Sequence, residues 1–367
     1  MRAKAVISRE VNQPVVVETI EVAPPRAGEV MVKLSACGVC HSDLSATNGT
    51  IPFPPPVILG HEGAGVVVEV GPGVSDFAVG DHVLSSFVTM CGVCHYCSIG
   101  RPALCDVGAK TLYTLPTGDL RTSDAAGKPL NVFSGLGVMA EYATVSTRSV
   151  VKIPQDAPLK QAALVGCGVM TGFCASTNTA RIEPGQVVAV FGCGGVGLSA
   201  IQGAAVAGAG MVVAVDIDDF KLELAKLMGA THTVNSKGDE NIVKTLKKLT
   251  GGGADVALEC VGSGELVATA YAALRRGGKA VVVGVARPKD TTTFRTASIT
   301  FEEKTLMGSY FGSARPREDA PRILGLYKSG KVKLDELVTR TYSIDEAPQA
   351  FADLEAGKNA RGVIVFG

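Results

Sequence analysis

The tightest restriction on the fold lies near the middle of the chain, where a glycine-rich turn joins two segments of different character. Residues 187–191 are typical of a buried strand, and residues 198–205 are typical of a helix. Between them runs Gly192-Cys193-Gly194-Gly195-Val196-Gly197, a G-x-G-x-x-G motif. Gly192 allows the tight turn, Gly194 lets backbone approach a pyrophosphate, and Gly197 permits close packing of helix on strand. The motif in this context predicts a dinucleotide site on a parallel sheet.

A carboxylate follows this motif at the spacing expected for a ribose contact. The strand-like residues 211–215 end at Asp216, about 20 residues after the glycines. A carboxylate there accepts hydrogen bonds from ribose hydroxyls and repels a 2′-phosphate, which favours NAD over NADP. The alternative is a glycine turn in an unrelated α/β domain, with Asp216 as a helix cap. Further strand-like runs at 255–259, 279–285 and 305–310 extend the sheet towards six strands.

Four of the ten cysteines are closely spaced in the first half of the chain. They are Cys91, Cys94, Cys97 and Cys105. This C-x2-C-x2-C-x7-C spacing fits a closed tetrahedral zinc site, which stabilises a lobe too poor in apolar side chains to fold alone. An iron–sulfur cluster, a rubredoxin-like iron and four unliganded thiols are the alternatives. A closed site of four cysteines leaves no position for a substrate, so its role is structural.

A second, scattered set of residues fits a catalytic metal. Cys40, His61 and Cys167 offer two thiolates and one imidazole, which leaves a fourth tetrahedral position open. Asp43 and Glu62 could supply the outer carboxylates that orient the imidazole. Taken singly, each has a plainer explanation: a buried cysteine, a core histidine or a solvated acid.

Composition excludes several classes of partner. The 367 residues carry 35 Lys+Arg and 35 Asp+Glu, so no net charge attracts nucleic acid or anionic lipid. No apolar stretch reaches the length of a membrane span. Charges at Arg2, Lys4 and Arg9 occupy the place of a signal peptide's apolar core, which predicts a cytoplasmic protein. The length predicts two domains.

Both metal sets and the dinucleotide loop together resemble the zinc-dependent medium-chain alcohol dehydrogenases. The most specific stretch is Gly60-His61-Glu62-Gly63-Ala64-Gly65, followed after five residues by Gly71-Pro72-Gly73-Val74. The resemblance runs along nearly the whole chain and implies an α/β protein. It places a mostly-β, GroES-like catalytic domain at residues 1–168 and 311–367, with the zinc lobe at about 91–105. A doubly wound Rossmann domain would occupy residues 169–310.

The resemblance also implies roles for individual residues. Cys40, His61 and Cys167 would hold the catalytic zinc, with Asp43 and Glu62 beside it, and Ser42 would hydrogen-bond the alcohol. Cys91, Cys94, Cys97 and Cys105 would hold the second zinc. His41 and Arg361 would contact the pyrophosphate, and Asp216 and Lys221 the adenosine ribose. The segment from residue 106 to 138 is similar to a loop of the dimeric enzymes, so a homodimer is expected, with a tetramer possible.

Two departures from the family pattern bear on the substrate. Ser45 stands where many members have the histidine that ends a proton relay, so the proton leaves by another path. Residues 50–56 lack the acidic groups of glutathione-dependent formaldehyde dehydrogenases, which argues against a charged thiol adduct. Ile51, Phe87 and Tyr310 match substrate-pocket positions and favour an apolar or aromatic primary alcohol. Phe87 and Tyr310 could equally be core aromatics.

The expected function is therefore oxidation of an alcohol to its aldehyde, reversibly, with two zinc ions per subunit and NAD. The enzyme alternative is a polyol or amino-alcohol dehydrogenase of the same superfamily. A non-catalytic NAD- or zinc-binding relative would be expected to lack a catalytic ligand, and none is missing. A zinc ribbon on nucleic acid fits poorly, because only Arg101 lies inside the lobe.

Overall fold

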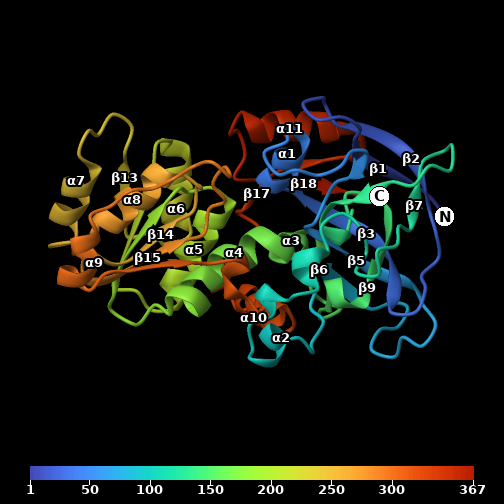
Figure 1. The fold of residues 1–367 in the computed structure, drawn as a ribbon, viewed down its shortest axis with the longest axis horizontal. Coiled ribbons are helices and arrows are strands. Elements are labelled where there is room, and N and C mark those ends of the chain that lie inside the picture. The colour runs from blue at the N-terminus through green and yellow to red at the C-terminus, as the bar shows by residue number, and fades with distance from the viewer. The chain divides into compact units, whose positions relative to one another are not determined.

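The chain divides into two structural units, each built around its own sheets (Figure 1). The computed structural model describes all residues from Met1 to Gly367. The first unit comprises Met1–Gly168, Arg315–Tyr327 and Leu334–Gly367, and the second comprises Val169–Ala314 and Lys328–Lys333. The chain thus returns to the first unit at Arg315, whereas the sequence placed this boundary at residue 311.

The second unit contains the predicted doubly wound parallel sheet, which is confirmed. Its six strands lie in the order β13-β12-β11-β14-β15-β16, the Rossmann arrangement. All five pairings are parallel. The strands are β11 (Val187–Phe191), β12 (Met211–Asp216), β13 (His232–Asn235), β14 (Ala254–Glu259), β15 (Leu274–Val282) and β16 (Thr305–Gly308).

Burial explains which of these strands the sequence reveals. β11, β12 and β14 are central strands and read as near-continuous apolar runs, because helices cover both faces of such a sheet. β13 has no buried residue, and its sequence HTVN carries no apolar pattern, so it was not predicted. β15 begins earlier than predicted, at Leu274, and β16 ends at Gly308 rather than at residue 310.

The first unit is mostly β, as the GroES-like expectation requires. A five-stranded sheet has the order β7-β2-β1-β4-β8; a seven-stranded sheet has the order β10-β6-β5-β3-β18-β17, with β9 also paired to β3. The first consists of β1 (Arg2–Ser8), β2 (Val16–Val22), β4 (Val57–Ile58), β7 (Thr122–Ser123) and β8 (Asn131–Val132). The second consists of β3 (Glu29–Val39), β5 (Gly63–Val70), β6 (His82–Ser85), β9 (Tyr142–Ser146), β10 (Val150–Lys152), β17 (Val338–Tyr342) and β18 (Arg361–Val365).

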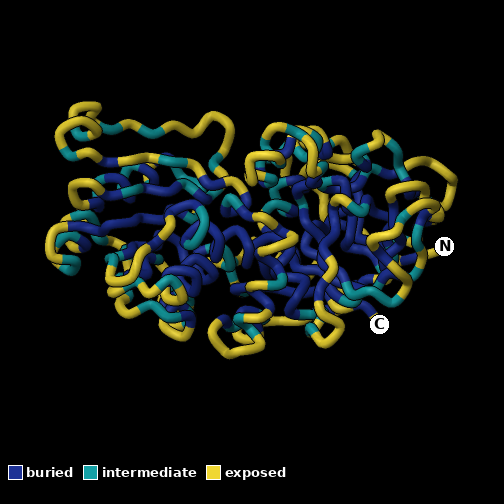
Figure 2. Tube along the Cα trace, turned by 90° about the horizontal axis from the view of Figure 1, so that it is seen from below, coloured by how far each residue is buried: buried dark blue, intermediate teal, exposed yellow.

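Eleven α-helices complete the structure, none of them both long and apolar enough to cross a bilayer. They are α1 (His41–Thr47), α2 (His95–Ser98), α3 (Leu159–Leu164), α4 (Met170–Cys174), α5 (Gly195–Val206), α6 (Asp219–Leu227), α7 (Ile242–Leu249), α8 (Gly264–Ala272), α9 (Thr296–Glu302), α10 (Pro316–Lys328) and α11 (Ala347–Glu355). Buried residues run through the interior of the trace, and exposed residues lie along its outside (Figure 2).

A buried ion pair anchors the long segment 106–138 to the first unit. Arg121 Nε donates to Glu29 Oε2 at 2.8 Å, and both side chains are almost fully buried. Glu29 begins β3, the strand that leads to the first predicted metal ligand. Removing one partner of such a pair leaves an uncompensated buried charge, so the contact holds the segment in place.

Candidate active site

The first ligand segment lies where β3 ends and α1 begins. Cys40 is the N-cap of α1, and Ser42 and Asp43 occupy its first turn. Asp43 Oδ2 accepts the Cys40 backbone N–H at 3.3 Å, so a carboxylate closes the helix start. The Ser42 hydroxyl lies 3.7 Å from Cys40 Sγ, beside the predicted metal ligand.

The second ligand segment is the turn between β4 and β5, which carries His61 and Glu62. Gly60 has φ 93°, a left-handed conformation that favours glycine, and a Cβ there would overlap the Met139 backbone nitrogen. His61 is 1% exposed, and its Nδ1 lies 3.3 Å from Asp43 Oδ1. That contact leaves Nε2 as the nitrogen available to a metal.

The third ligand segment continues α3 as a π-helical turn, Val165–Val169. Cys167 lies in its middle and is buried. Single π-helical turns within α-helices are rare, and those that occur are often found at functional sites. Cys167 belongs to such a turn.

The three segments converge on one cluster of donor atoms in the first unit. Ligand atoms of Cys40, His61, Glu62 and Cys167 all lie within 4.8 Å of one another, and all four residues are buried. His61 Nε2 is buried without a hydrogen-bond partner, which is costly unless something binds it. Two sulfurs and one nitrogen form a donor set suited to zinc, so the residues present fit a catalytic metal.

The buried groups of this cluster also perturb one another's pKa values. A hydrogen bond from Cys167 holds the pKa of the Cys40 thiol well below its usual value, against the effect of burial. Burial disfavours the charged imidazole, but Asp43 and Cys40 outweigh it and raise the pKa of His61 to about 10. Cys40 is therefore the thiol of this cluster that ionises readily, and a thiolate is the form of cysteine that binds a metal.

Glu62 is held by two contacts from distant parts of the chain. Its Oε1 accepts the Gly168 backbone N–H at 3.0 Å, and its Oε2 pairs with the guanidinium of Arg361. A Cβ at Gly38 would overlap Glu62 Oε2, so only glycine leaves room for this pair. Arg361 is buried, with Nε unpartnered, whereas His41 is exposed at the start of α1. The pyrophosphate contacts of both residues stay a prediction.

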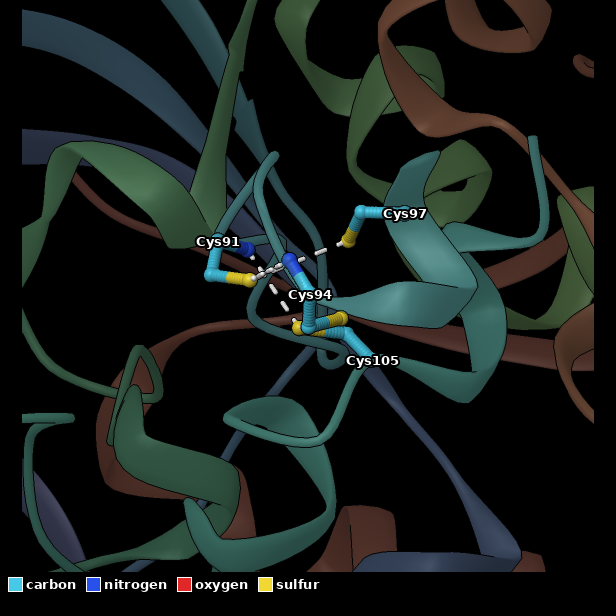
Figure 3. A group of neighbouring side chains, drawn as sticks. All are labelled: Cys91, Cys94, Cys97 and Cys105. Carbon is cyan, nitrogen blue, oxygen red and sulfur yellow. Dashed lines mark hydrogen bonds between the residues drawn. The ribbon is translucent and has the colours of Figure 1, made fainter. Parts of the chain in front are cut away.

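The four cysteines of the predicted lobe form the second cluster (Figure 3). Their sulfurs lie within 4.8 Å of one another, with Cys91 and Cys97 4.0 Å apart and Cys94 and Cys105 3.9 Å apart. The backbone N–H of Val93 lowers the pKa of Cys91 to about 6, against burial, while burial raises the pKa of Cys97 to about 12. Val93 and Ile99 of the lobe are 82% and 54% exposed, so the lobe has no apolar interior of its own. A closed metal site supplies what the lobe lacks.

The glycine motif has the geometry of a phosphate-binding turn. Gly192 has φ 88°, and a Cβ at Gly197 would overlap the Gly192 carbonyl oxygen, so helix and strand meet closely. A Cβ at Gly194 would meet no protein atom within 4 Å, which leaves open space beside the turn. Gly194 is the N-cap of α5 and offers no side-chain cap, so the first N–H groups of Gly195 and Val196 are available to an anion.

Asp216 and Lys221 lie beside this turn. Asp216 Oδ2 accepts the Cys193 backbone N–H at 2.6 Å, and Oδ1 accepts those of Ile217 and Asp218. Burial and the Asp216 charge raise the pKa of Cys193 to about 12, while Lys221 acts in the opposite direction. The structure therefore brings Asp216 to the glycine motif, and the charge of Lys221 acts on Cys193 of the same motif; the contacts of both residues with a ribose stay a prediction.

Of the predicted substrate residues, Phe87 contacts one of the predicted metal ligands. Its ring centroid is 5.9 Å from that of His61, in an edge contact, and Ile51 belongs to the same unit. Tyr310 follows β16 in the second unit and is 53% exposed. Phe133 was missed by the sequence reasoning, although its ring lies 5.2 Å from His61, because nothing local in residues 106–138 singles it out.

Two family comparisons cover most of the chain. Residues 26–155 match the alcohol dehydrogenase GroES-like domain, and residues 195–329 match the zinc-binding dehydrogenase family. An NDMA-dependent alcohol dehydrogenase from Amycolatopsis methanolica is 43% identical over 369 residues, covering 100% of this chain and 99% of the relative. An S-(hydroxymethyl)glutathione dehydrogenase from Synechocystis sp. is 39% identical over 373 residues, covering 100% of both.

The structure is also similar over its full length to the crystal structure of another dehydrogenase. Benzyl alcohol dehydrogenase from Acinetobacter calcoaceticus superposes with a TM-score of 0.93, at 34% identity and with 100% of both chains covered. The same two-unit arrangement of elements is thus found in a relative that acts on an aromatic alcohol.

Proposed function

The chain belongs to the zinc-dependent medium-chain alcohol dehydrogenase family, and from this premise we propose that it oxidises an apolar or aromatic primary alcohol with NAD as hydride acceptor. The supporting observation is the convergence of Cys40, His61 and Cys167, whose donor atoms lie within 4.8 Å and include an unpartnered imidazole nitrogen. Zinc held there would lower the pKa of the alcohol hydroxyl and so favour hydride release. The thiolate sites require a reducing compartment, so the proposal includes the cytoplasm.

The chain's own residues divide the remaining work. Ser42 lies beside Cys40 and would relay the hydroxyl proton of the alcohol, accepting it while its own hydroxyl proton passes on, before the hydride leaves. Asp43 holds the Nδ1 side of His61, which directs Nε2 towards the donor cluster. Glu62, fixed by Gly168 and Arg361, would offer a carboxylate oxygen to the same metal, since its ligand atom lies within the donor cluster. Since Ser45 is no base, the proton passes from Ser42 to solvent by a route without histidine at that position.

The aromatic substrate class is supported by the rings next to His61. Phe87 and Phe133 both contact the imidazole edge-on, and Phe53 packs on Phe133 at 4.4 Å. Aromatic rings favour edge-to-face and offset contacts with another ring. The similar benzyl alcohol dehydrogenase is consistent with this class, whereas residues 50–56 carry no charge for a glutathione adduct.

A substrate panel tests the proposal. Benzylic, allylic and straight-chain alcohols, a polyol, an amino alcohol and S-(hydroxymethyl)glutathione are compared by kcat/KM with NAD, NADP or NDMA as acceptor. NDMA is included because the 43% identical relative is named for its dependence on it. We expect benzylic alcohols with NAD to exceed the polyol and the glutathione adduct by about tenfold or more, or ~1.4 kcal/mol. Turnover of the polyol alone would favour the alternative enzyme, and no turnover with two zincs bound would favour a non-catalytic relative.

Asp216 should set the preference for NAD. Asp216→Asn keeps an acceptor for the Cys193 N–H but removes the charge facing a 2′-phosphate. We expect the NAD-to-NADP ratio of kcat/KM to fall by about tenfold, or ~1.4 kcal/mol. Steady-state kinetics with both cofactors measure it.

Asp218→Asn is the matched control for that ratio. Asp218 lies two residues further on, caps α6 through Phe220 N, and carries the same charge. Its loss should leave the ratio within about twofold of the unsubstituted protein. If the NAD-to-NADP ratio fell equally in both variants, the preference would depend on the total negative charge of this region. Asp216 would then have no specific role at the ribose site.

We also propose that the protein is a homodimer formed through the free edge of β16. β16 is the last strand of its sheet, so one side of its backbone has no strand partner. Leu306 of β16 is 37% exposed, and Ile299 and Phe301 of α9, the helix that precedes this strand, are 41% and 83% exposed. An exposed edge strand pairs readily with an identical one about a twofold axis, because the same surface serves both copies.

The double substitution Phe301→Asp with Leu306→Lys should convert the dimer to a monomer at micromolar concentration. Light scattering after size exclusion measures the mass and also distinguishes a tetramer. Val79→Asp is the control, because Val79 is 65% exposed but belongs to the first unit, whereas β16 belongs to the second. An unchanged mass in the double variant would place the interface elsewhere.

A further inference from the structure

Ser85, the last residue of β6, lies where two of the metal-ligand segments meet. It is 3% exposed and pairs through its backbone with Val150 of β10. Its strand also pairs with β5, which begins directly after Glu62. The backbone of Ser85 is therefore held in place by the sheet, independently of its side chain.

The Ser85 hydroxyl closes the turn that carries His61 and Glu62. It donates to the His61 carbonyl oxygen at 2.7 Å and accepts the Gly63 backbone N–H at 2.7 Å. These two groups flank Glu62, so one side chain restrains the backbone on both sides of it. Short, buried bonds of this kind leave the turn little freedom.

Ser85 also lies against the third ligand segment. A Cβ at Gly166 would lie 2.7 Å from the Ser85 carbonyl oxygen and 3.2 Å from its hydroxyl oxygen. The backbone of Gly166, one residue before Cys167, thus packs directly against Ser85. A single buried residue touches both the segment of His61 and that of Cys167.

We propose that Ser85 is a positioning residue for the catalytic metal, whose hydroxyl sets the spacing between His61 Nε2 and Cys167 Sγ. The inference rests on the proposed function, because it requires a metal bound by those donors. Metal affinity depends on ligands being held close to their bound positions by groups behind them. Without the hydroxyl, the His61 carbonyl and the Gly63 N–H lose their partner, and the turn relaxes away from Gly166.

Ser86 provides a matched control for the loss of a buried hydroxyl. It is 0% exposed, and its hydroxyl donates to the Val88 carbonyl oxygen at 2.9 Å. That bond lies outside the ligand segments. Ser85→Ala and Ser86→Ala should therefore destabilise folding similarly, while only Ser85→Ala should disturb the metal.

The test uses the purified full-length protein with Co²⁺ exchanged into the catalytic site. We measure the Co²⁺ absorption bands, the rate of metal loss to a chelator and the melting temperature. In Ser85→Ala we expect shifted bands and metal loss about tenfold faster than in the unsubstituted protein. Ser86→Ala should show native bands and a native rate, and Ser85→Thr, which keeps the hydroxyl, should restore both.

Equal bands and rates in the two alanine variants would overturn the inference. If Ser85→Ala does not fold, the same measurements are made on Gly166→Ala. Its Cβ would press on the Ser85 carbonyl oxygen, so it disturbs the same contact from the Cys167 segment. Native bands and a native rate in Gly166→Ala would also overturn it. Absence of a second, chelatable zinc from the unsubstituted protein would refute the proposed function itself, and the inference with it.

Discussion

Cys40→Ser and His61→Ala are expected to reduce kcat by about 10⁴-fold or more, equivalent to ~5.5 kcal/mol of transition-state stabilisation. Each removes one donor from a buried cluster that has no spare thiolate or imidazole within 4.8 Å. The zinc content should fall from two to about one per subunit. NADH binding should stay within about threefold, because the glycine motif belongs to the other unit.

Cys37→Ala is the control for the cysteine substitution. Cys37 lies on β3 three residues before Cys40 and is equally buried, and burial raises the pKa of its thiol well above the usual value. It is not among the donors of either cluster. The variant should keep two zincs and most of its activity, at a cost in stability. Substantial activity in metal-free Cys40→Ser would refute the catalytic assignment.

Cys94→Ser should lower the melting temperature by about 10 °C or more and reduce soluble yield. The lobe's Val93 and Ile99 are exposed and add little apolar burial, so we expect a metal held by the four cysteines to supply much of its stability. Backbone donors such as Cys94 N, 3.3 Å from Cys91 Sγ, depend on the same arrangement of sulfurs. Differential scanning calorimetry and zinc analysis measure both losses.

Ser98→Ala serves as the control within the same lobe. Ser98 is an exposed residue of α2 whose hydroxyl makes only a long 3.5 Å contact with Val93. Its melting temperature should change by no more than about 2 °C. A native melting temperature in Cys94→Ser, with one zinc lost, would show that the lobe folds without metal.

Much of the second unit was predictable because its signals are local. The strand, turn and helix from Val187 to Val206 lie in one continuous segment, and their apolar runs follow directly from burial of both sheet faces. β13 escaped prediction for the same reason, since an exposed strand at the sheet edge needs no apolar pattern. Element ends differed where polar residues such as Arg275 extend β15 at its exposed start.

The candidate site was predictable only in part. The metal ligands could be predicted from residue type, because cysteine and histidine are the usual ligands of zinc in proteins. Ser85 and Phe133 could not be predicted, because the role of a serine or a phenylalanine depends on which residues it contacts in the folded chain. Both became visible through contacts with His61: a hydroxyl on its carbonyl oxygen and a ring against its imidazole.

By itself the amino-acid sequence determined the chemistry available within short segments: a glycine turn before a helix, four cysteines in one lobe, and a strand ending in Asp216. Each of these features depends on residues a few positions apart, and the steric limits of the backbone determine their local geometry. Only the tertiary structure decided that Cys40, His61 and Cys167 meet, and that Arg361 reaches Glu62 across a separation of 299 residues. Such contacts arise from the packing of sheets and helices, which no local pattern encodes.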